Sequence, residues 1–346
     1  MSDGLFLAVL ALGCLLYLGW GFRVLPKERW QILASVPLRM EPGGQWQGLN
    51  LTWYGLLSAN AYWMAAALFW VLLRARGTQE MVILLFAALL LALCVPASSW
   101  MARLVEGKTA TLTVGGAVFV GLLASPLALV LTQKILGVHI ELLPLMAALG
   151  AAYALGEGLG RLACVSFGCC YGKPLEAAGP LTKKLFGRFH FAFAGATKKA
   201  AYAGNLEGRP LVPIQAITAL IYLGVALAGS FLFLRQHYGA GFLLCVLGTQ
   251  LWRVCSETLR CDWRGGGRLS AYQWMGLICI PFALLVSLVS PVPMEAPVRI
   301  AEGLGDLWQP APLVALHCLW LGIFLFTGRS LVTGSTMQFH VHGDRI

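Results

Sequence analysis

Charged residues are scarce in this sequence. Asp, Glu, Lys and Arg make up 12% of its 346 residues, and hydrophobic residues make up 58%. An average soluble domain is roughly one quarter charged. The apolar residues come in long runs, and a helix needs about 20 such residues to cross a bilayer. Because backbone polar groups in hydrocarbon must be paired within their segment, each run is expected to be helical. The composition excludes a soluble globular domain and predicts an all-α, polytopic membrane protein.

Motifs of common catalytic and nucleotide-binding sites are also missing. None of the six histidines lies in a catalytic constellation, and no serine–histidine pair, phosphate-binding loop or dinucleotide fingerprint is present. The net charge of +10 is spread over the loops without a nucleic-acid-binding motif. We therefore expect neither a cofactor nor a nucleic-acid partner.

Nine apolar runs predict transmembrane helices. Residues 51–291 would hold a core of seven of them, with a polar insertion at 173–212. Residues 1–50 would add a further helix and a basic loop, and residues 292–346 a loop, a last helix and a tail. The nine runs lie approximately at residues 4–22, 53–73, 80–102, 111–133, 141–160, 213–234, 239–256, 271–291 and 311–333.

The first run has an alternative interpretation as a signal peptide. Ala11-Leu12-Gly13-Cys14 loosely resembles a lipoprotein cleavage box. The residues that precede the run lack the positive charge of a signal n-region, which favours an uncleaved helix.

The cysteines fall into two kinds. Five stand singly within apolar runs, which is typical of small buried hydrophobes: Cys14, Cys94, Cys245, Cys279 and Cys318. Cys164, Cys169 and Cys170 instead crowd a glycine-rich junction. They form no C-x-x-C pair and no histidine stands at zinc-finger spacing, so no metal site is expected there. A direct role as redox or acyl-carrying thiols is a further interpretation, disfavoured because burial usually makes cysteine inert.

The insertion at 173–212 is basic and rich in aromatic residues. It could lie in the headgroup layer and attract anionic lipid. Alternatively, it is a solvated loop whose charge sets the topology. Lys and Arg gather in the loops after odd-numbered spans, and the positive-inside rule would place those loops in the cytoplasm.

Arg161 is the first charge at a span end that points to function. Before it, Ala148, Ala152, Gly156 and Gly160 recur every four residues, a stripe that lets a neighbouring helix approach closely. The glycines after Arg161 predict that the backbone then leaves the helix. Irregular backbone at membrane depth is tolerated against protein or a wet cavity. Arg161 is therefore expected at a cavity wall, where its guanidinium can bind a phosphate.

A second charged cluster ends the seventh span. Arg253, Glu257 and Arg260 follow one another at spacings of four and three, which places them on one helical face. Glu257 can pair with either arginine and leave the other for an anionic ligand. The alternative is a salt-bridge network that anchors the helix end.

Taken in order, these motifs resemble the prolipoprotein diacylglyceryl transferase family over about residues 50–290. The Gly-Cys-Cys-Tyr-Gly sequence at residues 168–172 resembles a divergent branch of that family. The matching motifs are Leu51-Thr52-Trp53-Tyr54-Gly55-Leu56, Val114-Gly115-Gly116, Gly160-Arg161-Leu162 with Gly168 and Gly172, Pro213-x-Gln215, Arg253 with Glu257 and Arg260, and Leu269-Ser270-x-x-Gln273.

The resemblance implies transfer of a diacylglyceryl group from phosphatidylglycerol to the thiol of a lipobox cysteine in a precursor protein, with departure of glycerol phosphate. It implies a multi-pass protein of the bacterial cytoplasmic membrane. Arg161 and Arg253 would bind the phosphate, and Glu257 would orient an arginine. The expected substrate-binding residues are Tyr54, Gly115, Gly116, Gly172, Gln215, Arg260 and Gln273.

The sequence departs from the family pattern at its polar positions. Ala163-Cys164 stands where the family has glycine-asparagine, Cys169 where it has glutamate, and Val114 where it has histidine. These replacements leave open a non-catalytic phospholipid-binding or lipid-transport protein that uses the same arginines. The family also places the insertion on the outer side of the membrane, opposite to the side that the Lys and Arg count indicates.

Overall fold

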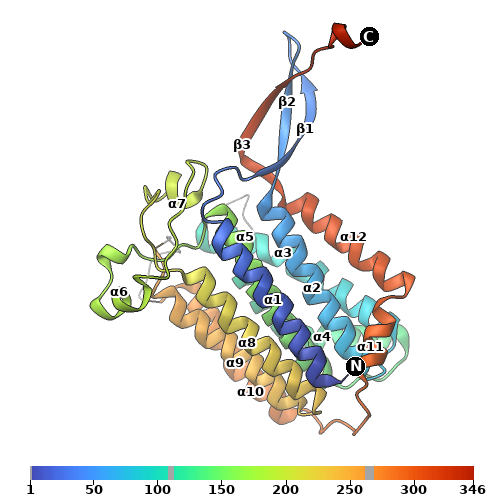
Figure 1. Ribbon diagram of the computed structural model, residues 1–346. Helices are drawn as coiled ribbons and strands as arrows, with labels where there is room; N and C mark the ends of the chain where they lie inside the picture. The colour runs from blue at the N-terminus through green and yellow to red at the C-terminus, as the bar shows by residue number, and fades with distance from the viewer. Residues whose placement is uncertain (1, 108–112, 262–268) are drawn as a thin grey trace.

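The computed structural model describes residues 2–107, 113–261 and 269–346 (Figure 1). Nine helices in this part of the chain are long and apolar enough to span a membrane, as predicted. They are α1 (Asp3–Val24), α2 (Trp53–Ala75), α3 (Glu80–Glu106), α4 (Val114–Leu136), α5 (Leu142–Phe167), α8 (Ile214–Leu234), α9 (Tyr238–Glu257), α10 (Ala271–Val289) and α12 (Pro310–Thr327).

Most predicted helix boundaries agree with the structure, and two do not. α2 begins at Trp53, within the Leu51–Leu56 motif, and α4 begins at Val114, the first residue of its motif; the predicted residues 111–112 lie outside the described part of the chain. The predicted end of the fifth span at residue 160 is wrong, because α5 continues to Phe167, and the backbone leaves the helix only at the first glycine after Arg161. No glycine or proline interrupts residues 161–167, and the helix ends at Gly168, whose φ of 66° is left-handed. The last helix ends at Thr327 rather than at residue 333.

A three-stranded antiparallel sheet extends from one end of the bundle, which the sequence analysis did not predict (Figure 1). Its strands are β1 (Ile32–Met40), β2 (Gln45–Thr52) and β3 (Arg329–Gln338). In its register Val36 faces Leu49, and Gly48 faces Ser335. The expected basic loop before residue 51 thus contains the hairpin of β1 and β2. The last residues of the predicted ninth span belong to β3. Pro37 is tolerated because β1 is an edge strand.

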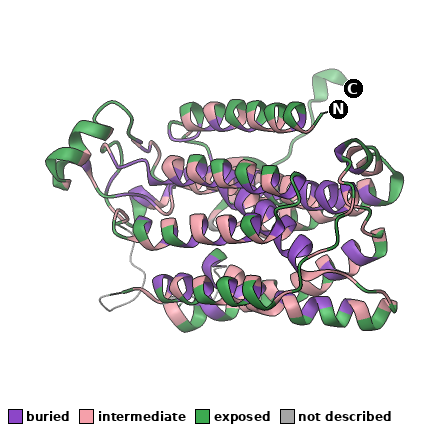
Figure 2. Ribbon diagram, turned by 90° about the horizontal axis from the view of Figure 1, so that it is seen from below, coloured by how far each residue is buried: buried purple, intermediate pink, exposed green. Residues whose placement is uncertain are grey.

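α5 is the central helix of the bundle. Buried residues make up 78% of its apolar window, against 22% for α1 and 11% for α12. It packs against α2, α8 and α9, and Figure 2 shows the buried residues gathered on the inner helices. The predicted small-residue stripe explains this packing, since a Cβ added at Gly156 would lie 2.8 Å from the Cβ of Ala65 on α2.

The insertion lies at the same end of the bundle as the sheet (Figure 1). It contains η1 (Leu175–Ala177), α6 (Pro180–Phe186) and α7 (Lys199–Tyr202), while α11 (Ile300–Leu307) precedes α12 and η2 (Gly343–Arg345) ends the chain. Lys198, one of the basic residues of the insertion, is completely buried rather than at the surface. Its Nζ donates to the carbonyls of Leu25 (2.8 Å) and Ser166 (2.7 Å), at the C-terminal ends of α1 and α5. A cation at these ends also meets favourable helix dipoles.

Candidate active site

A polar stripe runs along α5 toward its C-terminal end. Tyr153, Glu157, Arg161 and Cys164 are separated by four, four and three residues, a spacing that places them on one face of the helix. The stripe lies beside the small-residue face that packs on α2, so it is directed into the bundle rather than toward lipid. Charged side chains in such positions are expensive to bury and usually serve a function.

Glu157 joins two arginines within the bundle. Its carboxylate pairs with Arg161, one turn later on α5. It also accepts two hydrogen bonds from Nη2 of Arg253 on α9, at 2.9 and 2.8 Å. The side chain of Glu157 is 4% exposed, and those of Arg161 and Arg253 are 15% and 10% exposed. One carboxylate between two guanidinium groups leaves a net charge of +1 in a buried place.

Each guanidinium retains hydrogen-bonding capacity. Nε of Arg161 and Nε of Arg253 are buried and have no hydrogen-bond partner among the described residues, and the same holds for Oε1 of Gln215. Most buried polar atoms form a hydrogen bond with protein or water, so a buried polar atom without one indicates a place for a ligand or a water molecule. Two unpartnered N–H donors on adjacent cations suit an anion such as a phosphate.

Gly115 and Tyr272 fix the position of Arg253. A Cβ added at Gly115 would lie 2.8 Å from Nη1 of Arg253 and 2.5 Å from the completely buried ring of Tyr272. Arg253 also donates to the hydroxyl of Tyr153, at 3.1 Å. The beginning of α4 therefore needs a glycine at this point to let the arginine reach Glu157. Gly116 has a packing role, because its Cβ would lie 2.5 Å from Cβ of Met101.

The expected single face of Arg253, Glu257 and Arg260 is not formed. α9 ends at Glu257, and Arg260 lies beyond the helix. The carboxylate that pairs with Arg253 is Glu157 on α5, while Glu257 lies 3.9 Å from Arg260. The backbone of Arg260 forms a β-bridge with Gly172, so these residues hold the loop after α5. At Gly172 an added Cβ would lie 2.3 Å from the carbonyl oxygen of Val212.

The two predicted glutamines begin helices, as expected, and have different surroundings. Nε2 of Gln215 donates to the Cys169 carbonyl at 2.8 Å, in the loop that follows α5. Gln273 completes a capping box with Ser270 and donates to the Val254 carbonyl at 3.0 Å. The amide of Gln273 thus joins the start of α10 to α9.

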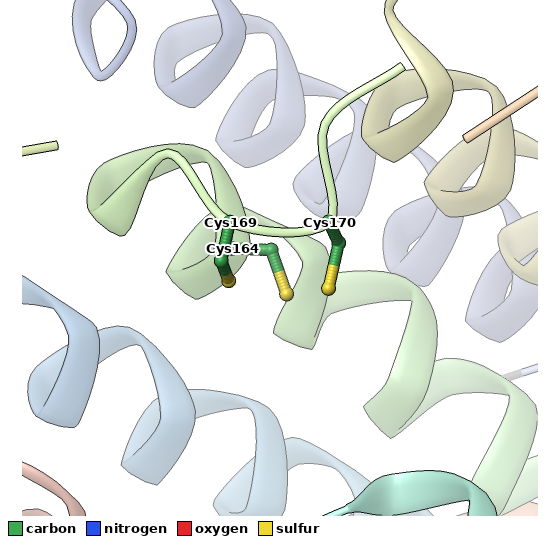
Figure 3. Close-up of side chains that lie close together, drawn as sticks. All are labelled: Cys164, Cys169 and Cys170. Carbon is green, nitrogen blue, oxygen red and sulfur yellow. The ribbon is translucent and has the colours of Figure 1, made fainter. Parts of the chain in front are cut away.

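Three cysteines converge where α5 ends. Gly168 turns the chain back, and the Cys169 N–H donates to the Cys164 carbonyl at 3.0 Å. The sulfur atoms of Cys164, Cys169 and Cys170 lie within 4.8 Å of one another, and their side chains point to the same side of the loop (Figure 3). The neighbouring thiols, that of Cys164 first, and burial raise the pKa of Cys169 well above its usual value. The crowding of the three cysteines was expected from the sequence, but a group of sulfur atoms that could hold a metal ion was not, because their spacing matches no standard metal-ligand pattern.

Arg161 and Tyr54 adjoin the cysteines. Arg161 interacts electrostatically with Cys164 and Cys170, and Tyr54 does so with all three thiols. The Tyr54 ring packs edge-on against Phe167, with centroids 5.8 Å apart. The structure thus gathers Tyr54, Arg161, Arg253, Gly115 and Gln215 at one end of the bundle. Glu157 was missed as a site residue, although its spacing of four from Arg161 signals the pair.

A lateral groove of about 590 Å³ lies apart from these residues, between α1, α2 and α12. Asn60 on α2 donates to the Tyr17 hydroxyl at 3.0 Å and accepts from Nε1 of Trp320 at 2.8 Å. This one amide therefore joins the first and last helices to the bundle. The groove is lined by Gly13, Cys14, Tyr17, Asn60, Trp63, Met64, Leu159, His317 and Trp320.

A protein-family model matches most of the chain. The family model described as prolipoprotein diacylglyceryl transferase matches residues 45–289. A search of curated proteins returns no match. The matched segment runs from β2 to the end of α10 and contains every residue of the site described above, whereas α1, α11, α12 and β3 lie outside it.

Proposed function

Because the chain belongs to the prolipoprotein diacylglyceryl transferase family, we propose that it transfers a diacylglyceryl group from phosphatidylglycerol to a cysteine thiol of a lipobox-containing precursor or a related acceptor. The observation that carries this proposal is the buried Arg161–Glu157–Arg253 cluster, in which both arginines keep an unpartnered Nε.

The charge of the cluster suits this donor. Two guanidinium groups and one carboxylate carry +1 together, and a phosphodiester headgroup linkage carries one negative charge. When glycerol phosphate departs, its phosphate gains a second negative charge. Guanidinium groups that are already oriented stabilise such developing charge at little cost of reorganisation. Glu157, rather than Glu257, is the residue that orients both arginines, and Glu257 with Arg260 supports the neighbouring loop.

The proposed reaction is a substitution at carbon. The acceptor sulfur, as thiolate, attacks the diacylglyceryl carbon that carries the phosphate oxygen. A C–S bond forms and the C–O bond breaks, with its electron pair leaving on the phosphate oxygen. Arg161 and Arg253 hold that oxygen and its neighbours, and the thiol proton must be removed before or during the attack. Tyr54 and Gln215 line the same end of the bundle and would help to position the lipid.

The proposed location is a bacterial cytoplasmic membrane. The nine candidate spans support a multi-pass protein. We place the sheet and the insertion on the outer side, as the family resemblance implies, against the indication of the basic residues. Long loops obey the charge rule weakly, and basic residues that bind lipid headgroups are a physical reason for an exception.

The decisive experiment uses the full chain in proteoliposomes that contain labelled phosphatidylglycerol. A lipobox peptide is added, and mass spectrometry searches for the diacylglyceryl thioether. We expect product with the wild type and a loss of at least about 100-fold with Arg161→Ala or Arg253→Ala. Arg299→Ala, which removes an exposed arginine of the opposite end, is the matched control and should retain activity.

One outcome would overturn the proposal. If no thioether forms, while the protein still binds phosphatidylglycerol and the two arginine variants abolish that binding, the chain is a lipid-binding or transport protein. A serine peptide in place of the cysteine peptide tests the nature of the acceptor.

A further inference from the structure

The three cysteines at the end of α5 form a preorganised group. Cys164 lies in the last turns of the helix, and Cys169 and Cys170 lie on the returning loop (Figure 3). Three hydrogen bonds hold the loop. The Cys169 N–H donates to the Cys164 carbonyl, and Nε2 of Gln215 donates to the Cys169 carbonyl. The Ala200 N–H donates to the Gly168 carbonyl at 3.0 Å. Cys170 adopts a left-handed φ of 54°, a conformation that side chains other than glycine rarely take. The fold therefore imposes the positions of the thiols.

We propose that Cys164, Cys169 and Cys170 bind one thiophilic divalent cation of the zinc type, and that the fourth position of this cation takes the acceptor thiol of the proposed transfer. The second half of this inference rests on the proposed function, and the first half does not.

The geometry fits a metal with three thiolate ligands. Zinc–sulfur bonds of about 2.3 Å in a tetrahedral site place sulfur atoms just under ~4 Å apart. The present separations of up to 4.8 Å need only small side-chain rotations to reach that arrangement. Three protein ligands with one open position are typical of catalytic zinc sites, whereas structural sites use four. No fourth cysteine, histidine or carboxylate joins the group among the described residues.

The position fits activation of a thiol. A metal-bound thiol is deprotonated outright, and its proton passes to solvent water or buffer. The bound thiolate would lie next to Arg161, three residues from Cys164 on the same face of α5 and in electrostatic contact with Cys164 and Cys170. The acceptor thiolate and the lipid phosphate would thus both lie next to Arg161.

The cation would also supply a group that deprotonates the acceptor thiol, which this sequence otherwise lacks. The chain has Val114 and Cys164 where the family pattern has histidine and asparagine, so the usual polar groups are absent where thiol and lipid would react. In the proposed step the metal-bound sulfur attacks the diacylglyceryl carbon, the C–O bond breaks, and the electron pair leaves on the phosphate oxygen bound by Arg161 and Arg253. The step is a substitution and needs neither an oxidant nor a reductant.

The first test is metal content and does not depend on activity. The full chain in nanodiscs is incubated with Zn²⁺, freed of excess metal and assayed by elemental mass spectrometry. We expect one zinc ion per chain in the wild type and at least a tenfold loss of affinity in Cys164→Ser, Cys169→Ser and Cys170→Ser. Cys318→Ser, at an exposed single cysteine on α12, is the matched control and should keep the ion. Cys169→His supplies another donor and should restore binding if Cys169→Ser folds poorly.

The second test replaces zinc by Co²⁺, whose visible spectrum reports a tetrahedral site and its thiolate ligands. A cysteine peptide should strengthen the thiolate-to-cobalt bands, and the serine peptide should leave them unchanged. Absence of stoichiometric metal in the wild type, or an intramolecular disulfide among the three cysteines in the purified protein, overturns the inference. Full transfer activity in chelator-treated protein overturns it too and leaves the proposed function intact. Metal binding with a response to the cysteine peptide but no thioether supports the site and contradicts the proposed lipid transfer.

Discussion

Glu157 and Arg253 are 96 residues apart in the sequence and meet inside the bundle, toward the end at which α5 and α9 finish, where both carboxylate oxygens accept from Nη2 at 2.9 and 2.8 Å. Arg161 shares the same carboxylate. The contact joins α5 to α9 and places two cations side by side. Isolated cations would not be tolerated at this depth, so the glutamate makes the arrangement possible.

Glu157→Gln should destabilise the protein and abolish its function. The substitution keeps the shape of the side chain but leaves two buried guanidinium groups without their counter-charge, a change that costs about 3–5 kcal/mol in comparable buried pairs. Thermal unfolding in nanodiscs should show a lower melting temperature, and thioether formation should fall to background. Arg299→Met, which breaks an exposed ion pair with Glu302, should leave both measurements unchanged. Wild-type melting and activity in Glu157→Gln would contradict the assigned role.

Gly115→Ala should act on Arg253 without touching its charge. The added methyl group would lie 2.8 Å from Nη1 of Arg253 and 2.5 Å from the Tyr272 ring, and forcing a methyl group into a packed site costs about 1–3 kcal/mol. We expect the arginine to be displaced and the transfer rate to fall by more than the loss of folded protein explains. Gly224→Ala, at a helical glycine with open space around it, is the control and should be neutral. Equal rates for the two variants would show that Gly115 does not position Arg253.

Much of the fold could be predicted because hydrocarbon imposes strict rules on the chain. Long apolar runs predicted the nine helices, and the family motifs marked the starts of α2 and α4. The sheet was missed because β1 and β2 lie outside the apolar runs, because the start of β3 falls within the ninth run, and because β2 pairs with β3 from the far end of the chain. A glycine turn at Gly43-Gly44 between short alternating segments was the available local signal for the hairpin.

The sequence identified most residues of the candidate site but not which carboxylate pairs with which arginine. Helical spacing alone suggested Glu257 as the partner of Arg253, and it cannot reveal a contact between helices far apart in the sequence. Arg253 pairs with Glu157 rather than with Glu257 because α5 and α9 pack together and bring the Glu157 carboxylate within reach. The meeting of Cys164 with Cys169 and Cys170 depends on the left-handed turn at Gly168, a tertiary detail that a search for regular ligand spacings does not detect.

Asn60→Leu should loosen the first and last helices from the bundle. The substitution removes the hydrogen bonds to Tyr17 and Trp320 and leaves both groups unpaired. Interhelical hydrogen bonds in membranes average about 0.6 kcal/mol each, so we expect a loss of about 1–2 kcal/mol. Hydrogen exchange by mass spectrometry should show faster exchange at the end of α1 and in α12. Trp320→Phe loses only one of the two bonds and should give an intermediate effect; unchanged exchange in Asn60→Leu would contradict the role of this amide.

Lys198→Met should lower stability in a pH-dependent manner. Lys198 satisfies the carbonyls of Leu25 and Ser166, and burial lowers its pKa from 10.5 to about 8. Between about pH 8 and pH 10.5 the unfolded chain therefore binds more protons here than the folded protein, so the stability contributed by Lys198 rises with pH across this window. The neutral amine still has two N–H groups for the two carbonyls. The stability of the wild type relative to Lys198→Met, derived from their melting temperatures, should increase by roughly 2 kcal/mol between pH 7 and pH 9.5. A constant difference would show that the lysine keeps its proton throughout.

The side of the membrane that the sheet faces can be tested with reporter fusions. In the structure the sheet, the insertion and the C-terminal residue lie at one end of the bundle, so a single fusion after Ile346 reports on all three (Figure 1). The family resemblance predicts the outer side, where alkaline phosphatase folds into an active, disulfide-bonded enzyme, whereas the positive-inside count predicts the cytoplasm. We expect an active phosphatase after Ile346 and an inactive one after Pro297, which follows α10 at the opposite end. The reverse pattern would place Arg161, Arg253 and the three cysteines at the cytoplasmic surface, where thiols stay reduced, and would require the acceptor to be modified before it crosses the membrane.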